Sequence, residues 1–116
     1  MNLEIQTRQL ELDPAWRDSI ERQAKRLSER YPEMLQLHVT LTHLAHHRQG
    51  TEEVALLAAV EGATLRAHKR EEHVHTAIHA AFGALETEIE RHHRERRDKK
   101  GAPAIRDSPV RDRDRA

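Results

Sequence analysis

The chain of 116 residues contains no cysteine, which excludes disulfide bonds, thiolate catalysis and cysteine-ligated metal sites. Its three aromatic residues, Trp16, Tyr31 and Phe82, are too few to favour nucleic-acid binding by base stacking. The longest apolar run, Val54 to Val60, is too short to cross a bilayer, and no secretory signal is visible at the N-terminus. We therefore expect a single cytoplasmic domain with no membrane partner.

The local motifs of common enzymes are also missing from the sequence. It has no glycine-rich phosphate loop and no nucleophile elbow. The acidic pairs Glu52-Glu53 and Glu71-Glu72 adjoin expected strands, and because neighbouring residues on a strand point to opposite faces, the two carboxylates of each pair cannot share a site. We expect neither enzymatic activity nor a cofactor.

Histidine, in contrast, occurs ten times. His43, His46 and His47 cluster in one polar connection, and His75 and His79 are one helical turn apart, a spacing that can bind zinc or nickel. Because no acidic residue or third histidine occupies a matching helical position, we expect no metal site. We interpret the histidines as added positive charge below neutral pH, since free histidine has a pKa of about 6.5.

Charge is segregated along the chain, although its formal net charge is zero. Residues 91–116 carry ten Lys/Arg and five Asp/Glu, whereas residues 1–90 carry ten Lys/Arg and fifteen Asp/Glu. Such an asymmetry favours one oriented face for an anionic partner. A solvated helix end followed by a tail is the plainer alternative.

Alternating apolar residues predict four strands, at residues 3–7, 35–42, 54–60 and 65–70, of which the last is shorter. Between the third and fourth strands, Gly62 can adopt the positive φ of a tight turn. The second, third and fourth strands are expected to form an antiparallel meander.

Two helices are predicted from apolar stripes of helical period. The first starts at Asp13-Pro14, an N-cap followed by proline, and ends before Pro32, about 17 residues later. The second runs from His73 to Lys100. The resulting order, β-α-β-β-β-α, predicts an α+β two-layer sandwich in which both helices cover one face of a four-stranded sheet and the other face is polar.

The second helix is amphipathic only as far as Ile89 and strongly basic afterwards. At about 1.5 Å per residue it would be roughly 40 Å long, so we expect its basic end to project from the domain. Basic residues of both helices would form a groove or ridge suited to phosphates. The predicted RNA-binding residues are Arg22, Lys25, Arg26, Arg30, Arg91, Arg94, Arg97 and Lys100, with Arg66 and Arg70 as secondary candidates at the sheet edge.

Several local motifs, in their order and spacing, resemble the ribosome hibernation promoting factor family. They are Asn2-Leu3-Glu4-Ile5-Gln6, Asp13-Pro14-Ala15, Val60-Glu61-Gly62-Ala63-Thr64-Leu65-Arg66-Ala67, an acidic pair, Ala77-Ile78 and Ala84-Leu85-Glu86. The likeness covers residues 1–97, and we expect 98–116 to be a basic, disordered tail. The absence of a C-terminal dimerisation domain makes the chain similar to the short form of the family.

The resemblance implies a fold similar to double-stranded-RNA-binding domains. It also implies a translation inhibitor that binds rRNA phosphates in the decoding channel of the small ribosomal subunit and blocks tRNA and messenger. Ala84, Thr87 and Glu90 stand where the family usually has basic residues, which moves the expected basic surface toward the C-terminal end of the helix.

We expect the free protein to be a monomer that does not bind DNA. Two other interpretations remain open. One is a non-enzymatic protein-interaction module that docks an acidic partner through the basic helix end. The other, less favoured, is a metal-binding sensor that uses the histidines.

Overall fold

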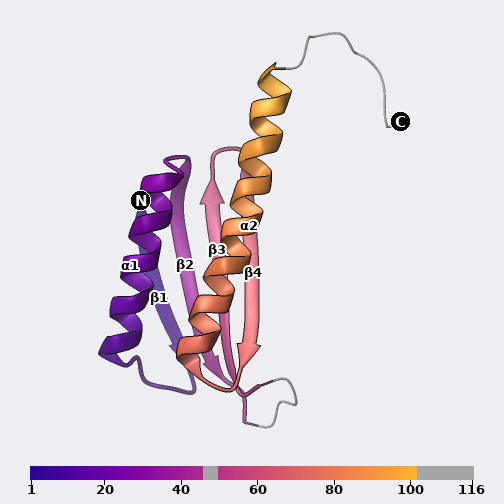
Figure 1. Ribbon diagram of the computed structural model, residues 1–116. Coiled ribbons are helices and arrows are strands. Elements are labelled where there is room, and N and C mark those ends of the chain that lie inside the picture. The colour runs from indigo at the N-terminus through magenta and orange to yellow at the C-terminus, as the bar shows by residue number, and fades with distance from the viewer. Residues whose placement is uncertain (46–49, 102–116) are drawn as a thin grey trace.

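The computed structural model describes residues 1–45 and 50–101, the last five by their backbone alone, and confirms the order β-α-β-β-β-α (Figure 1). The elements are β1 (Asn2–Arg8), α1 (Pro14–Arg30), β2 (Met34–His43), β3 (Glu52–Val60), β4 (Ala63–Glu71) and α2 (Val74–Gly101). The helix α2 passes through the expected domain boundary at residue 97. Of the predicted tail, residues 102–116 lie outside the described part.

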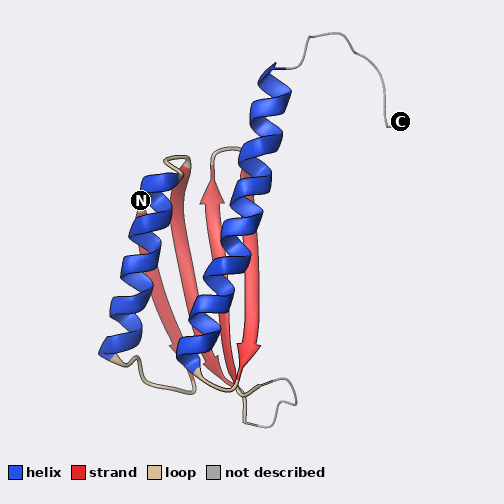
Figure 2. Cartoon of the chain, viewed as in Figure 1, coloured by secondary structure: helices blue, strands red, loops and turns tan. Residues whose placement is uncertain are grey.

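The sheet has the order β1-β2-β3-β4, with β1 parallel to β2 and the other pairs antiparallel. A parallel pair needs a crossover connection, and α1 provides it between β1 and β2. The predicted antiparallel meander of β2, β3 and β4 is confirmed. Both helices cover the same face of the sheet, as the two-layer prediction requires (Figure 2).

The fourth strand is longer than the sequence pattern predicted. It has nine residues, as many as β3, and its pairing with β3 continues from Val60↔Ala63 to Glu52↔Glu71. The apolar alternation stops earlier because β4 is an edge strand, whose last residues are polar yet still pair through their backbone. An ion pair between Arg70 Nη2 and Glu53 Oε2, 3.1 Å apart, links the two strands at this end.

The core lies between the sheet and the two helices. Leu37 and Val39 of β2 are fully buried there, as are Ile78 and Leu85 of α2, and Leu56 of β3 is 2% exposed. These are the inward positions of the stripes recognised in the sequence, so the predicted core is confirmed. Within the described residues, neither helix contains an apolar stretch long enough to span a membrane.

Both ends of α1 follow the local sequence. The Asp13 side chain accepts a hydrogen bond from the backbone N–H of Ala15 at 2.8 Å, and Pro14 occupies the first helical position. At the other end Tyr31 is the C-cap, and its backbone N–H donates to the carbonyl oxygen of Leu27 at 2.8 Å. This cap fixes the backbone from which the Tyr31 ring extends.

Two glycines have a positive φ. Gly62, in the β3–β4 turn, has φ +87°, which confirms the prediction. Gly50, which precedes β3, has φ +124°, and a Cβ there would lie 2.5 Å from the backbone carbonyl carbon of Glu71. Only glycine lets the chain pass this close to the end of β4.

Candidate nucleic-acid interface

The helices α1 and α2 lie side by side and run in the same direction, since Gln23 and Arg26 lie beside His79 while Arg30 reaches Glu86 further along (Figure 1). Between them is a furrow, which we call the inter-helix groove. On α1 it is lined by Ser19, Arg22, Gln23, Arg26 and Arg30, and on α2 by His79, Gly83, Glu86, Thr87, Glu90 and Arg94.

The lower section of the groove, toward the helix N-termini, is basic. Arg22, Arg26 and His79 line a hollow of about 220 Å³ together with Ser19 and Gln23. The buried Ser19 hydroxyl accepts a hydrogen bond from Gln23 Nε2 at 3.2 Å. No carboxylate lines this hollow among the residues described, so its side chains offer cationic and polar groups to a ligand.

The middle section is organised by contacts between the helices. Arg30 Nη1 donates to Glu86 Oε2 at 2.9 Å, and the Arg30 guanidinium lies 5.4 Å from the centroid of the Tyr31 ring. The Tyr31 hydroxyl donates to the Glu90 carboxylate. Burial, followed by this hydrogen bond, raises the pKa of Tyr31 to about 12. The same bond holds the pKa of Glu90 below its usual 4.5.

Beyond Ile89 the inward stripe of α2 continues with polar residues. His93 Nδ1 lies 2.8 Å from Glu33 Oε2, and His92 Nε2 donates to the carbonyl oxygen of Glu61 at 3.1 Å. Arg96 donates to the same carbonyl and to the Glu61 carboxylate, at 3.0 and 3.1 Å. Burial opposes ionisation of Glu33, but its own backbone N–H and His93 outweigh this and lower its pKa.

These contacts correct one sequence-based expectation. The basic end of α2 was expected to project as a whole, but it is attached to the sheet end as far as Arg96, and the helix projects only beyond that residue. The signal was present in the sequence, since His92, His93 and Arg96 follow Ile89 at helical spacing. A search for apolar stripes does not reveal it, because all three residues are polar.

The groove brings together four of the predicted RNA-binding residues. Arg22, Arg26 and Arg30 line it from α1, and Arg94 lines it from α2. Two of the four are already paired, because Arg22 Nε lies 3.3 Å from Asp18 and Arg30 bonds to Glu86.

Other predicted residues lie outside the groove. Lys25 is exposed on α1, and Arg91 is exposed on α2, 3.3 Å from Glu88. Arg97 and Lys100 belong to the last turns of α2, and their side chains lie outside the described part.

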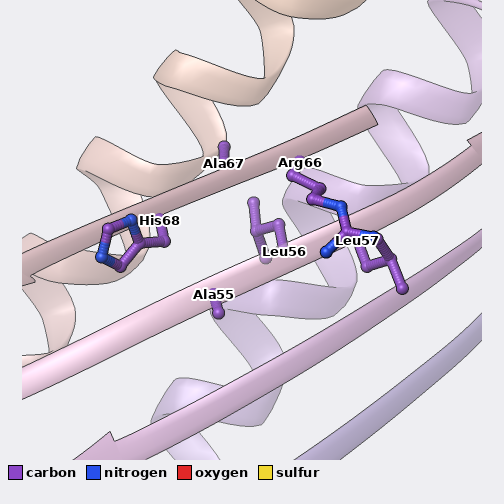
Figure 3. A pocket seen from close by; sticks show the side chains of 6 residues that line it. All are labelled: Ala55, Leu56, Leu57, Arg66, Ala67 and His68. Atoms are coloured by element: carbon purple, nitrogen blue, oxygen red, sulfur yellow. The ribbon is translucent and has the colours of Figure 1, made fainter. Parts of the chain in front are cut away.

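Arg66 and Arg70 are on the edge strand β4, but their side chains lie on the sheet face away from the helices. Arg66 stands opposite Leu57, which is 39% exposed, and with His68 it borders a shallow hollow of about 420 Å³ (Figure 3). Leu57 and Ala55 therefore interrupt the polar sheet face that the sequence predicted. The structure does not bring these two arginines together with those of the groove.

The histidines give two observations. His75 and His79 do meet, with their Nε2 atoms 3.2 Å apart. His43 bonds to Glu52 at 2.8 Å, whereas His46 and His47 lie outside the described residues. Within the described part, no group of three or more histidine or acidic residues could hold a metal ion.

Comparison with known proteins gives a consistent result. The family model described as Sigma 54 modulation protein / S30EA ribosomal protein matches residues 3–97. The N-terminal domain of Protein Y from Thermus thermophilus is 29% identical, with a TM-score of 0.66, over 78% of this chain and 98% of that one.

A ribosomal subunit interface protein from Coxiella burnetii also has a TM-score of 0.66, over 79% of this chain and 97% of that one. Its 16% identity supports a common fold and nothing finer. No curated protein sequence matches this chain.

Proposed function

Because this chain belongs to the Sigma 54 modulation protein / S30EA ribosomal protein family, we propose that it binds the small ribosomal subunit in the decoding channel. It inhibits translation there by occupying the space that tRNA and messenger need. The observation that carries the proposal is the lower section of the inter-helix groove, which presents Arg22 and Arg26 in a domain of this family.

The ligand is the phosphate backbone of rRNA. Guanidinium groups form paired hydrogen bonds with phosphate oxygens, and each neutralised phosphate releases counterions. Lys25 and Arg26 are exposed and carry no ion pair among the described residues. The pair between Arg22 and Asp18 is also exposed, and such pairs contribute only about 0–1 kcal/mol, so Arg22 can exchange its carboxylate for a phosphate at little cost.

The end of α2 supplies a second set of contacts. The helix extends past the sheet beyond Arg96 (Figure 1), and Arg97 and Lys100 are on its last turns. We assign Arg91, Arg97 and Lys100 to rRNA, and Arg66 and Arg70 to secondary contacts from the opposite face. The action is occupancy without catalysis, by a monomer in the cytoplasm.

Sedimentation through a sucrose gradient tests this function. The protein is mixed with purified small subunits at low salt and located by immunoblot, with and without initiator tRNA and messenger. We expect co-sedimentation that is reduced by tRNA or messenger and falls steeply with salt.

Two results would contradict the proposal. Absence from the small-subunit fractions at low salt would favour the acidic-protein partner instead. Binding that tRNA and messenger leave unchanged would mean general affinity for polyanions.

A further inference from the structure

Resting on the proposed function, we propose that the protein contacts RNA phosphates at two separate places, of which only one is in the inter-helix groove. That place is the lower section of the groove around Arg22 and Arg26. The other lies outside the groove, at Arg91 and the last turns of α2. Between them Glu86 and Glu90 close the middle section to anions. The two carboxylates thus determine where along the groove a nucleic-acid backbone can lie.

The middle section has no net positive charge to offer. Arg30 and Arg94 line it, but so do Glu86 and Glu90. Arg30 is held by Glu86 at 2.9 Å, and the charge of Arg94 acts on Glu90, whose pKa it helps to lower. A phosphate entering here would meet two carboxylates and would gain no net attraction from the two guanidiniums.

The carboxylates are fixed in place. Glu90 accepts a hydrogen bond from Tyr31, whose ring is 3% exposed and whose backbone caps α1. The Arg30 guanidinium lies over that ring and completes the contact with Glu86. Opening the middle section would therefore break a partly buried hydrogen bond as well as an ion pair.

The lower section differs from the middle section in its charge and in having no carboxylate that is held in place by buried groups. Among the described residues no carboxylate lines its 220 Å³ hollow, and Glu86 enters only the adjoining hollow. Asp18, which pairs with Arg22, has a side chain that is 67% exposed. His79 and Arg91 are 12 positions apart on α2, or about 18 Å at 1.5 Å per residue. Phosphates bound at the two places are therefore not neighbours on one strand.

Glutamine substitution tests the role of the carboxylates. The double variant Glu86→Gln, Glu90→Gln keeps side-chain size and hydrogen-bond acceptors while freeing Arg30 and Arg94. We expect it to bind small subunits severalfold more tightly than the native protein. The slope of log affinity against log salt should steepen by about 0.7–0.9, the value of one added phosphate contact.

A matched control changes total charge equally at other sites. Glu4→Gln, Glu11→Gln replaces two exposed carboxylates outside the groove, one of which is on the open sheet face. Equal affinity and equal slope for the two double variants would overturn the inference while leaving the proposed function intact. Failure of the native protein to bind would instead overturn the proposed function and this inference with it.

A second pair of variants serves if the first disturbs folding. Gln23→Glu adds a carboxylate to the lower section, and Thr87→Glu adds one to the middle section. We expect the first to weaken binding severalfold and the second to change it much less, because the middle section receives no phosphate. An equal or larger loss for Thr87→Glu would overturn the inference.

Discussion

Arg96 bonds twice to Glu61, through the backbone carbonyl at 3.0 Å and the carboxylate at 3.1 Å. The contact joins a helix position well past the last core residue, Ile89, to the turn between β3 and β4. It means that the orientation of the basic end of α2 is set by the sheet, not by the helix alone. A basic surface that has to meet a shaped polyanion benefits from such a constraint, because less ordering remains for binding.

Replacing Arg96 with alanine should lower the free energy of unfolding by about 0.5–1 kcal/mol, since one hydrogen bond to the backbone and one partly exposed ion pair are lost. Urea unfolding followed by circular dichroism measures this change. Arg91→Ala is the control, because Arg91 is more exposed than Arg96 and its pair with Glu88 lies within the helix, worth about 0.2–0.5 kcal/mol. Equal losses for the two variants would show that the Glu61 contact does not hold α2.

The single tyrosine allows a direct test of the contact between the helices. Tyr31 should ionise near pH 12, because burial and the bond to Glu90 favour its neutral form. The folded pKa is above the unfolded value of 10.0, so this stabilisation is complete below pH 10 and is lost as pH rises toward 12. Tyrosinate absorbance against pH measures the midpoint. Glu90→Gln should lower this midpoint. A midpoint near the ordinary tyrosine value of 10.0 in the native protein would contradict the contact between Tyr31 and Glu90.

Truncation of the core should be costly. Ile78→Ala or Leu85→Ala should destabilise the protein by about 2–5 kcal/mol, because both side chains are fully buried between α2 and the sheet. Leu57→Ala is the control, since Leu57 is 39% exposed on the open sheet face. Thermal or urea unfolding separates them, and a loss of a few tenths of a kcal/mol at Ile78 would mean that the stripe is not core.

Gly50 should tolerate no side chain. Gly50→Ala adds a Cβ 2.5 Å from the Glu71 backbone, at a φ that alanine rarely adopts, so we expect a loss of about 1–3 kcal/mol or more. Gly62→Ala also introduces a Cβ at a positive φ, +87°, but into open space, and should cost about 1 kcal/mol. Comparing the unfolding free energies of the two variants separates the cost of backbone strain combined with a steric clash from the cost of backbone strain alone. Equal losses would mean that the backbone around Gly50 can move away from Glu71.

The fold could be predicted from the sequence because the spacing of apolar residues along each strand and helix identifies its buried face. Leu37 and Val39 alternate with polar residues, and Ile78 and Leu85 repeat at helical spacing, so each segment specifies its own buried face. The family resemblance, which depended on motif order, is confirmed by the match over residues 3–97.

The candidate site could be predicted only in part. Helical spacing places Arg22 and Arg26 on one side of α1, but it does not show which acidic residues of another element face them. The pairs of Arg30 with Glu86 and of Arg96 with Glu61 join residues 56 and 35 positions apart. Such pairings depend on how helices and sheet are assembled. Arg66 is different, because it alternates with Leu65 and Ala67 and the strand period alone places it on the face away from the helices.

Charge reversal on two faces should show which face of the protein meets the ribosome. Arg22→Glu, Arg26→Glu reverses two exposed groups that line the lower section of the groove. It should abolish small-subunit binding at moderate salt, because phosphate attraction becomes repulsion at one of the two proposed contacts. The fold should be retained, since neither side chain is part of the core.

The matched variant Arg66→Glu, Arg70→Glu makes the same change in total charge on the opposite sheet face. It should weaken binding by a smaller factor, since these residues are secondary contacts in the proposal. Co-sedimentation across a salt series, with circular dichroism to verify folding, gives both affinity and salt slope. A stronger effect of the second variant would place the ribosome contact on the open sheet face, beside Leu57, and the groove would then have to serve another partner.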